Sequence, residues 1–214
     1  RKDVEEEEFL VIFLGCDGGS TKTEWLLVDH TGQVLAHRIF PGCNFAFWGE
    51  DGFRDLMVRS VQTLLADSGI TSQQITSAML SLTVYGEVPG TEEFFPQVMQ
   101  SILPDCPLQF SNDSVAGWCG SLAGRPGINI VAGTGSVAYG QDPAGNASRV
   151  GGWSLFFADE GSCSWVARQI ITEFVKQADG RHPRSAIYEE LRRELSITHD
   201  LYFSGFLQNN VRQD

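Results

Sequence analysis

Apolar residues along the chain change their spacing several times, and each spacing predicts a different type of element. Residues 9–15 and 25–28 are continuous apolar runs of the length expected for buried strands. Residues 33–39 have the pattern of a third strand and follow the turn sequence Asp29-His30-Thr31-Gly32. The chain is therefore expected to open with a small antiparallel sheet.

Helical and extended patterns then alternate, which indicates an α/β fold. Apolar residues recur at helical spacing from Phe53 to Leu65, and Gly69 is placed to end that helix. Similar patterns predict further helices at 92–103 and 112–122 and short strands at 78–82 and 108–110. The glycine- and proline-containing segment 123–127 then indicates a domain boundary near residue 120.

A second α/β unit begins after this boundary. Residues 128–131 and 137–140 have extended patterns on either side of a glycine-containing loop. A long helical pattern follows that carries Val166, Ile170, Phe174 and Val175, and Asp159 is placed as its N-cap. Further helical patterns lie at 185–195 and from 201 onward. The helix at 185–195 is amphipathic, with Ile187, Leu191 and Leu195 as its inward positions. No strand pattern returns after these helices, so the second sheet is expected to be incomplete.

The loop between the first two strands contains the residues needed to bind an anion. Gly18 and Gly19 let the backbone turn with a positive φ, and the backbone N–H groups, Ser20, Thr21 and Lys22 supply donors. The second unit repeats this arrangement at Gly133-Thr134-Gly135-Ser136. Two such loops, about one hundred residues apart, predict twin domains that bind one polyphosphate.

Two better-known nucleotide-binding motifs do not fit these loops. A P-loop would continue into Gly-Lys-Ser/Thr and a helix, whereas residues 25–28 are expected to form a strand. The segment Gly133-x-Gly135-x-x-Ala138 fits a dinucleotide fingerprint, which must open a helix, but residues 137–143 contain a hairpin-like turn. A P-loop and a dehydrogenase are therefore not favoured.

The composition narrows the set of partners. The 214 residues contain 15 basic and 27 acidic side chains, and the formal charge of −12 repels nucleic acid and anionic lipid. Residues 1–8, with four consecutive glutamates, are expected to form a solvated acidic tail. The five cysteines lack a C-x-x-C pair, which argues against a disulfide framework or a zinc site. No apolar run approaches the ~18 residues of a membrane span, so a cytoplasmic protein is expected.

Five segments taken together resemble the N-acetylglucosamine kinase or BadF/BadG/BcrA/BcrD-type ATPase family of the actin, hexokinase and Hsp70 superfamily. In chain order they are Asp17-Gly18-Gly19-Ser20-Thr21-Lys22-Thr23, Asn44, Asn112-Asp113, Gly133-Thr134-Gly135-Ser136, and Gly151-Gly152-Trp153 with Asp159-Glu160-Gly161-Ser162. The resemblance implies an α/β, actin-like ATPase fold of two ribonuclease H-like lobes, 9–120 and 121–214, with ATP and a sugar between them. Family members continue through a glycine-rich, adenosine-binding segment that has no match here, so the C-terminal lobe is expected to be truncated.

The resemblance implies a role for each matched position. Asp113 matches the catalytic base, whose carboxylate accepts the proton of the attacking sugar hydroxyl. Asp17, at the end of the first strand, matches the carboxylate that orients Mg²⁺ through its water ligands. The matches to the loops that bind the ATP phosphates are Gly18, Gly19, Ser20, Thr21, Lys22, Gly133, Thr134, Gly135 and Ser136. The matches to the sugar site are Asn44, Asp113, Thr134, Gly152, Trp153 and Asp159.

The function implied is ATP-dependent phosphorylation of a sugar hydroxyl, with an amino sugar such as N-acetylglucosamine or glucosamine as substrate. ATP and Mg²⁺ are the implied cofactors, and a homodimer is left open as the assembly. Two other functions stay open: an ATPase activator of a radical dehydratase, which holds an iron–sulfur cluster through cysteines, and a non-catalytic sensor of sugar or nucleotide. An intact Asp113 argues against the sensor, because a sensor has no need of a base. From the residues alone, Asp113 and Asp159 are also typical of helix N-caps, and Trp153 of a core side chain.

Overall fold

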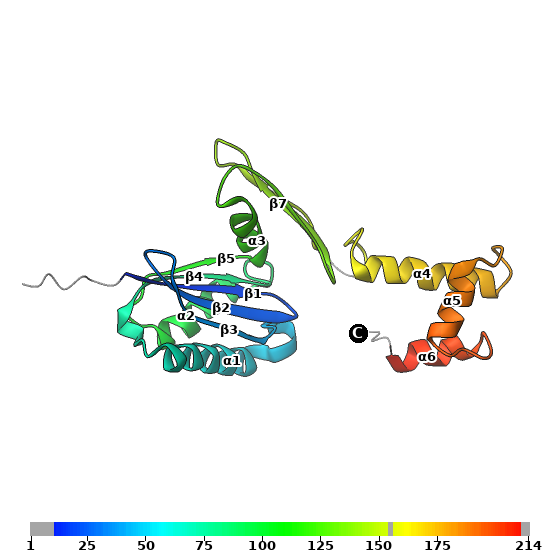
Figure 1. Cartoon of the computed structure of the whole chain (residues 1–214), viewed down its shortest axis with the longest axis horizontal. Coiled ribbons are helices and arrows are strands. Elements are labelled where there is room, and N and C mark those ends of the chain that lie inside the picture. The colour runs from blue at the N-terminus through cyan, green and yellow to red at the C-terminus, as the bar shows by residue number, and fades with distance from the viewer. Residues whose placement is uncertain (1–10, 154–155, 211–214) are drawn as a thin grey trace, which may run out of the picture. The chain divides into compact units, whose positions relative to one another are not determined.

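The computed structural model describes residues 11–153 and 156–210 (Figure 1). These residues form two compact units. The first contains residues 11–129 and 139–148, and the second contains residues 130–138, 149–153 and 156–210. The acidic tail expected at 1–8 lies outside the described residues, and the division into lobes after residue 120 stays a prediction.

The first unit is built on a five-stranded sheet in the order β3-β2-β1-β4-β5. Its strands are β1 (Ile12–Gly18), β2 (Lys22–Asp29), β3 (Val34–Pro41), β4 (Ile75–Leu82) and β5 (Leu108–Ser111). The antiparallel opening is confirmed, because β1 pairs with β2 and β2 pairs with β3 in antiparallel register. β4 runs parallel to β1, and β5 runs parallel to β4. The carboxyl ends of β1, β4 and β5 therefore lie along one edge of the sheet.

Helices cover both faces of this sheet, α1 and α2 on one face and α3 on the other (Figure 1). They are α1 (Phe45–Ser68), α2 (Thr91–Ile102) and α3 (Asp113–Leu122), and a short 3₁₀ helix, η1 (Ser72–Gln74), precedes β4. As predicted, α1 ends at Gly69, which adopts a φ of +68° that favours glycine. It begins well before the predicted Phe53, because Asn44 caps it, and Gly49 with a φ of +63° interrupts its first turns.

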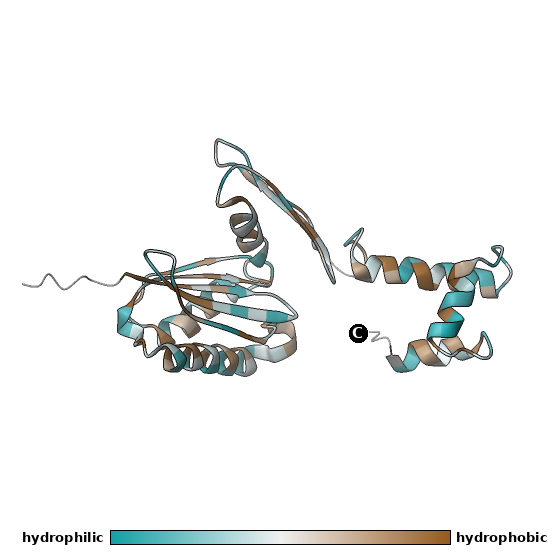
Figure 2. Ribbon diagram, viewed as in Figure 1, coloured by the Kyte–Doolittle hydropathy of each residue, from teal (hydrophilic) through white to brown (hydrophobic). Residues whose placement is uncertain are grey.

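The core of the first unit lies between the sheet and the pair α1 and α2. Alternate residues of β2 point into it, so that Trp25 and Leu27 are completely buried. Phe53 of α1 stacks on Phe95 of α2 with ring centroids 4.2 Å apart. Figure 2 shows apolar and polar residues alternating along α1, the pattern of a helix that buries one side.

A second sheet contains β6 (Gly127–Ala132), β7 (Ser136–Gln141) and β8 (Ala147–Gly151) in that order. The predicted strand, glycine loop and strand are confirmed, and β7 turns back into β8 instead of opening a helix. Asp142 holds this turn, since its Oδ1 accepts from the backbone N–H groups of Ala144 (2.9 Å) and Asn146 (2.8 Å). The absence of a dinucleotide-binding helix after the loop is therefore confirmed, and no further strand follows in residues 156–210.

The second unit contains three helices, α4 (Cys163–Ala178), α5 (Ala186–Glu194) and α6 (Tyr202–Asn210). Their shared core contains Phe174, Tyr188, Ile197 and Phe203. The prediction that Ile187 points inward is wrong, because Ile187 is 40% exposed and Tyr188 is 1% exposed. Tyr188 is buried instead because its ring stacks on Phe174 and its hydroxyl donates to the Asp200 carboxylate at 2.9 Å.

Two apolar residues of α4 are not buried either. Val166 and Ile170 have helical spacing with Phe174, yet both are exposed and only Phe174 is buried. Periodicity places residues on one side of a helix but cannot say how much of that side a neighbour covers. Within residues 11–153 and 156–210, none of the helices combines the length and the apolar character that a membrane crossing requires.

Candidate active site

The loop that joins β1 to β2 packs against residues 42 and 43. The N–H of Gly42 donates to the carbonyl of Thr21 at 3.1 Å, and the N–H of Cys43 donates to the carbonyl of Gly19 at 3.0 Å. A side chain at position 42 would place its Cβ 2.1 Å from the carbonyl oxygen of Ser20, so only glycine allows this approach. The side chains of Ser20 and Thr21 stay exposed. The hairpin itself is as predicted, but the positive φ predicted for Gly18 and Gly19 is wrong, since Gly18 is still part of strand β1 and neither residue adopts it. The contact of the hairpin with phosphate stays a prediction.

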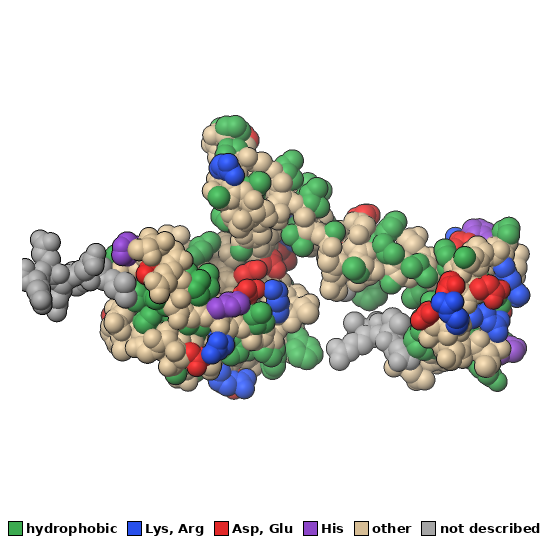
Figure 3. All heavy atoms as spheres, in the orientation of Figure 1, with side chains coloured by type: hydrophobic (Ala, Val, Ile, Leu, Met, Phe, Trp, Pro, Cys, Tyr) green, Lys and Arg blue, Asp and Glu red, His purple; other side chains and the backbone are tan. Residues whose placement is uncertain are grey.

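Gly18 and Lys22 bound this loop. A Cβ at Gly18 would lie 2.6 Å from a δ-carbon of Leu82 and 2.7 Å from the Sγ atom of Cys43, so these buried side chains would have to shift. The ammonium of Lys22 lies 2.7 Å from a carboxylate oxygen of Glu24, and this hydrogen bond raises the pKa of Lys22. Figure 3 shows acidic, basic and histidine side chains grouped together on the first unit. The ammonium of Lys22 is already paired with the carboxylate of Glu24, and a contact between Lys22 and phosphate stays a prediction.

Asn44 links α1 to the first loop. Its Oδ1 accepts from the N–H of Ala46 at 3.0 Å, which caps α1, and its Nδ2 lies 3.4 Å from the Oγ of Ser20. Ser20 Oγ is also 3.4 Å from the Oγ1 of Thr83, a residue that the sequence did not point to. The N–H of Thr83 donates to the carbonyl of Gly18 at 2.6 Å. Its position directly after β4 could have identified it, because the carboxyl ends of parallel strands line the sites of α/β sheets.

Asp113 is the first residue of α3 and not its N-cap. The cap is Asn112, whose Oδ1 accepts from the N–H of Ser114 at 3.2 Å and from the Ser114 hydroxyl at 2.8 Å. The alternative interpretation of Asp113 as a capping residue is therefore wrong, since the preceding side chain already satisfies the start of the helix. Capping does not account for a carboxylate at position 113.

Asp113 acts electrostatically on the segment that packs against the first loop. Burial raises the pKa of the Cys43 thiol to about 11, and the negative charge of Asp113 contributes to this rise. Cys43 in turn donates its N–H to Gly19 of the loop. Because α3 follows β5 at the edge where β1 also ends, the base candidate and the first loop lie in one region of the first unit.

The burial of Cys43 leads to a labelling prediction. A thiol with a pKa of about 11 is almost entirely protonated at pH 8, and the thiolate is the form that reacts. Iodoacetamide should therefore modify the exposed Cys119 and Cys163 of the folded chain and leave Cys16 and Cys43 unmodified, as read by mass spectrometry of the peptides. The urea-unfolded chain is the control, in which all cysteines should react. Rapid labelling of Cys43 in the folded chain would contradict the packing described for residues 42 and 43.

Asp17 lies at the end of β1, on the face of the sheet that α3 covers. It lines a cavity of about 770 Å³ whose walls include Glu24, Ser81 and Val115. Its side chain reaches solvent, yet desolvation by its surroundings raises its pKa, while Lys22 lowers it. A cation near Asp17 would favour its ionised form.

The binding of hydrated Mg²⁺ beside Asp17 stays a prediction. In the described part of the chain, no cluster of three or more His, Cys, Asp or Glu side chains is arranged to hold a metal. The resemblance implies that Mg²⁺ is held there through its water ligands. Mg²⁺ commonly binds in this way, through one or two carboxylates and several retained waters.

The second glycine loop, residues 133–136, belongs to the second unit and packs on the start of α4. The carbonyl of Gly133 accepts from the N–H of Cys163 at 2.8 Å, and Ser136 Oγ donates to the carbonyl of Glu160 at 2.9 Å. These bonds hold the loop against the segment that carries Asp159. The contact of this loop with phosphate stays a prediction.

Asp159 is not the N-cap of α4, in contrast to the prediction. Ser162 is the cap, since its Oγ accepts from the N–H of Trp165 at 3.1 Å, and Gly161 lets the chain turn once more before the helix begins. Asp159 adopts a φ of +62° and is 4% exposed. Its Oδ1 is buried with no hydrogen-bond partner among the described residues. Because an unpaired buried acceptor costs about 1–3 kcal/mol, this atom indicates a place for a ligand donor.

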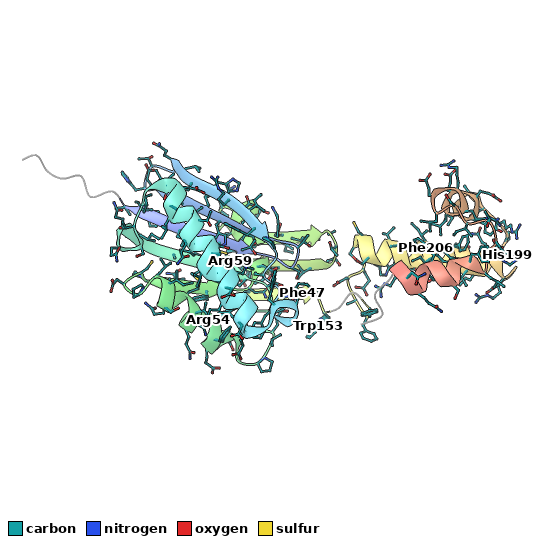
Figure 4. The ribbon with its side chains drawn as sticks, turned by 90° about the horizontal axis from the view of Figure 1, so that it is seen from below. Phe47, Arg54, Arg59, Trp153, His199 and Phe206 are labelled. Atoms are coloured by element: carbon teal, nitrogen blue, oxygen red, sulfur yellow. The ribbon has the colours of Figure 1, made fainter. Side chains whose placement is uncertain are left out.

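Gly152 and Trp153 follow β8. Gly152 has a φ of +69°, and its carbonyl accepts from the guanidinium of Arg149 at 2.9 Å. Trp153 is 86% exposed (Figure 4), so its interpretation as a core residue is wrong, and its role in sugar binding stays a prediction. The predicted site residues thus form two groups. The first unit holds Asp17, Gly18, Gly19, Ser20, Thr21, Lys22, Asn44 and Asp113, and the second unit holds Gly133, Thr134, Gly135, Ser136, Gly152, Trp153 and Asp159.

The sequence matches a known family and characterised relatives. It matches the model of the BadF/BadG/BcrA/BcrD ATPase family over residues 14–200. It is 27% identical over 198 residues to an N-acetyl-D-glucosamine kinase from Dictyostelium discoideum, covering 87% of this chain and 61% of that protein. It is 23% identical over 207 residues to an N-acetylmuramic acid/N-acetylglucosamine kinase from Clostridium acetobutylicum, covering 92% of this chain and 66% of that protein. The chain thus spans less than two thirds of the length of these relatives.

Solved structures share the fold. A proposed N-acetylglucosamine kinase from Chromobacterium violaceum superposes with a TM-score of 0.63 at 21% identity, over 86% of this chain and 64% of that one. A proposed N-acetylglucosamine kinase from Porphyromonas gingivalis superposes with a TM-score of 0.66 at 20% identity, over 95% of this chain and 66% of that one. At these identities the likeness concerns the fold alone, and it confirms the α/β, actin-like ATPase fold.

Proposed function

Because this chain belongs to the BadF/BadG/BcrA/BcrD ATPase family, we propose that it takes part in the ATP-dependent phosphorylation of a sugar hydroxyl. The acceptor that we propose is an amino sugar, N-acetylglucosamine or glucosamine. The names of the curated relatives support this choice of substrate.

The observation that carries the proposal is the position of Asp113. Its carboxylate begins α3 without capping it, because Asn112 is the cap, and its charge acts on Cys43 beside the first loop. In the proposed reaction, Asp113 accepts the proton of the sugar hydroxyl while the oxygen attacks the γ-phosphorus of ATP. The bond from that phosphorus to its bridging oxygen breaks, and ADP leaves with the electron pair.

The proposed phosphate contacts come from the two glycine loops. In the first unit, the exposed hydroxyls of Ser20 and Thr21 would donate to phosphate oxygens. In the second unit, residues 133–136 would do the same. Asp17 would hold the waters of Mg²⁺, which when bound neutralises charge on the phosphates. We expect Thr83 to hold Ser20 in place, since their hydroxyl oxygens are 3.4 Å apart.

The proposed sugar contacts include Asp159. Its unpaired Oδ1 would accept a hydrogen bond from a sugar hydroxyl, which would satisfy a buried acceptor that has no partner in the described part of the chain. Asn44, Thr134, Gly152 and Trp153 are the further contacts that we propose. Trp153 is exposed enough to pack its ring on the sugar.

Replacing Asp159 by alanine should weaken sugar binding by about 1–3 kcal/mol, because sugar hydroxyls lose a buried acceptor. The melting temperature without sugar should change little, since the cap of α4 is Ser162 and the removal of an unsatisfied oxygen opposes the cost of alanine at a φ of +62°. Calorimetric titration and thermal melting of both proteins measure these effects. Ser162→Ala is the matched control, which should lower the melting temperature with little change in sugar affinity. Unchanged affinity in Asp159→Ala would remove Asp159 from the sugar site.

The proposed function is tested by incubating the protein, at its full natural length, with ATP, Mg²⁺ and a panel of amino sugars and hexoses. We expect phosphorylation of at least one amino sugar, detected by mass spectrometry, with ADP released in equal amount. ATP hydrolysis without any sugar phosphate, together with the visible absorption of an iron–sulfur cluster, would support the activator instead. Sugar or nucleotide binding with no turnover would support the sensor.

A further inference from the structure

Residues 83–90 form a loop that joins β4 to α2 and lies next to the candidate base. Val84, in this loop, has a φ of +61°, which is a strained conformation for a β-branched residue. Its carbonyl accepts from the N–H groups of Glu87 at 3.0 Å and Val88 at 3.2 Å. Strained residues that are held this firmly concentrate at functional sites. The side chains that this loop presents are therefore candidates for a role.

The first end of the loop is tied to the phosphate-binding hairpin. The N–H of Thr83 donates to the carbonyl of Gly18 at 2.6 Å, and its hydroxyl lies 3.4 Å from the hydroxyl of Ser20. The strained residue follows Thr83 directly. The backbone of the loop thus starts from a fixed point in the site.

The middle of the loop is tied to the cap of α3. The Nδ2 of Asn112 donates to the Oε1 of Glu87 at 2.8 Å and lies 3.5 Å from the carbonyl oxygen of Tyr85. The Oδ1 of the same amide accepts from the N–H and the hydroxyl of Ser114. The two ends of an amide point in opposite directions, so a partner that fixes Nδ2 also fixes Oδ1. Glu87 is solvent-exposed, but a charged acceptor makes a stronger hydrogen bond than a neutral one.

We propose that Glu87 is a positioning residue for the base: it holds the amide of Asn112 in the orientation that caps α3, and thereby fixes the Asp113 carboxylate that follows. The loop 83–90 contains both Glu87, which contacts Asn112, and Thr83, which contacts Ser20 of the first glycine loop. The same loop would therefore position both the base and the phosphate-binding hydroxyl. The proposal rests on the proposed kinase function. It adds Glu87 and Asn112, neither of which touches the reacting atoms.

A charge-conserving exchange tests the contact between the two side chains. In the natural protein the amide of Asn112 lies 2.8 Å from the Glu87 carboxylate. Asn112→Asp alone replaces this amide by a second carboxylate, so the two negative charges repel and the contact is lost. In the double variant Glu87→Gln with Asn112→Asp, the new amide at position 87 would donate to the new carboxylate at position 112, so the contact returns with its direction reversed. The net charge of the pair is then that of the natural protein. Aspartate also caps helices well, so α3 keeps its cap.

Turnover is the first measurement, in the protein at its full natural length. We expect Asn112→Asp and Glu87→Ala to lower kcat by about 10- to 100-fold with little change in the KM for ATP, because a small misplacement of a catalytic group is costly. Glu87→Gln, whose side-chain oxygen can still accept, should stay within about threefold of the natural protein, and the double variant should recover most of the loss. Glu93→Ala, an exposed glutamate on α2, is the control and should change nothing.

Amide hydrogen exchange at Ser114 and Val115 is the second measurement, and it needs no activity. Faster exchange in Asn112→Asp, reversed in the double variant, would show that Glu87 and Asn112 are coupled as described. The same exchange pattern with unchanged kcat would overturn the proposal, because the pair would then be merely structural. Exchange rates that do not respond to either substitution would also overturn it. A natural protein that phosphorylates no sugar would refute the proposed function, while exchange would still report whether the contact exists.

Discussion

Replacing Asp113 by asparagine is expected to lower turnover by about 10²- to 10⁴-fold, the range that a general base typically contributes. Asparagine keeps the shape of the side chain but cannot take the proton of the attacking hydroxyl. The helix should keep its cap, since the cap is Asn112, and losing the charge of a first-turn carboxylate should cost it no more than about 1 kcal/mol. Sugar affinity should change much less than turnover, because positioning and charge neutralisation are left in place. Initial rates at saturating ATP and sugar, with calorimetric sugar binding, measure both quantities in the protein at its full natural length.

Asp105→Asn is the matched control for this prediction. Asp105 is an exposed carboxylate in the same unit, in the turn between α2 and β5, and its substitution should leave turnover unchanged. If Asp113→Asn keeps turnover within a few-fold of the natural protein, Asp113 is not the base. That result would favour a protein that binds sugar or nucleotide without catalysis.

Replacing Gly42 by alanine is expected to lower the free energy of unfolding by about 3 kcal/mol, the upper end of the usual cost of overpacking. The added Cβ would lie 2.1 Å from the carbonyl oxygen of Ser20 and 2.7 Å from the backbone nitrogen of Thr21. Backbone atoms cannot move aside as the end of a flexible side chain can, so the two segments must separate. The hydrogen bond from Gly42 to Thr21 would then be lost. Urea unfolding followed by circular dichroism measures the change.

Gly120→Ala is the control, because a Cβ there meets nothing within 4 Å and the residue lies inside α3. That substitution should leave stability unchanged or raise it by about 0.5–1 kcal/mol through helix propensity.

Phosphate binding should also weaken in Gly42→Ala, since the first loop loses its contacts with residues 42 and 43. An unchanged unfolding midpoint in Gly42→Ala would show that residues 42 and 43 do not pack against the loop as described.

The sequence alone determined the parts of this protein that depend on local patterns. The opening antiparallel strands, the end of α1 at Gly69 and the strand, loop and strand around residues 133–136 all form as predicted. Each depends on residues that are close together in the chain, such as Gly69 where φ is positive and continuous apolar runs where strands are buried. The family resemblance was equally accessible, because several short segments in a fixed order are improbable by chance.

Only the tertiary structure decided which polar side chain takes which role. Asp113 and Asp159 are both typical of N-caps, yet Asn112 and Ser162 are the caps, because capping depends on where the backbone enters the helix. The sequence also did not show which side of α5 is buried. Tyr188 is buried in place of Ile187 because its ring stacks on Phe174 and its hydroxyl donates to Asp200.

The contacts of Thr83 and Glu87 are further examples that no local pattern contains. Thr83 contacts Ser20, which is 63 residues away in the sequence, and Asn112 contacts Glu87, which is 25 residues away. Parallel strands β1, β4 and β5 bring these segments to one edge of the sheet, and strand order is a property of the whole fold. The sequence therefore identifies the chemistry of the candidate site, whereas the packing of distant segments decides which side chains hold it in place.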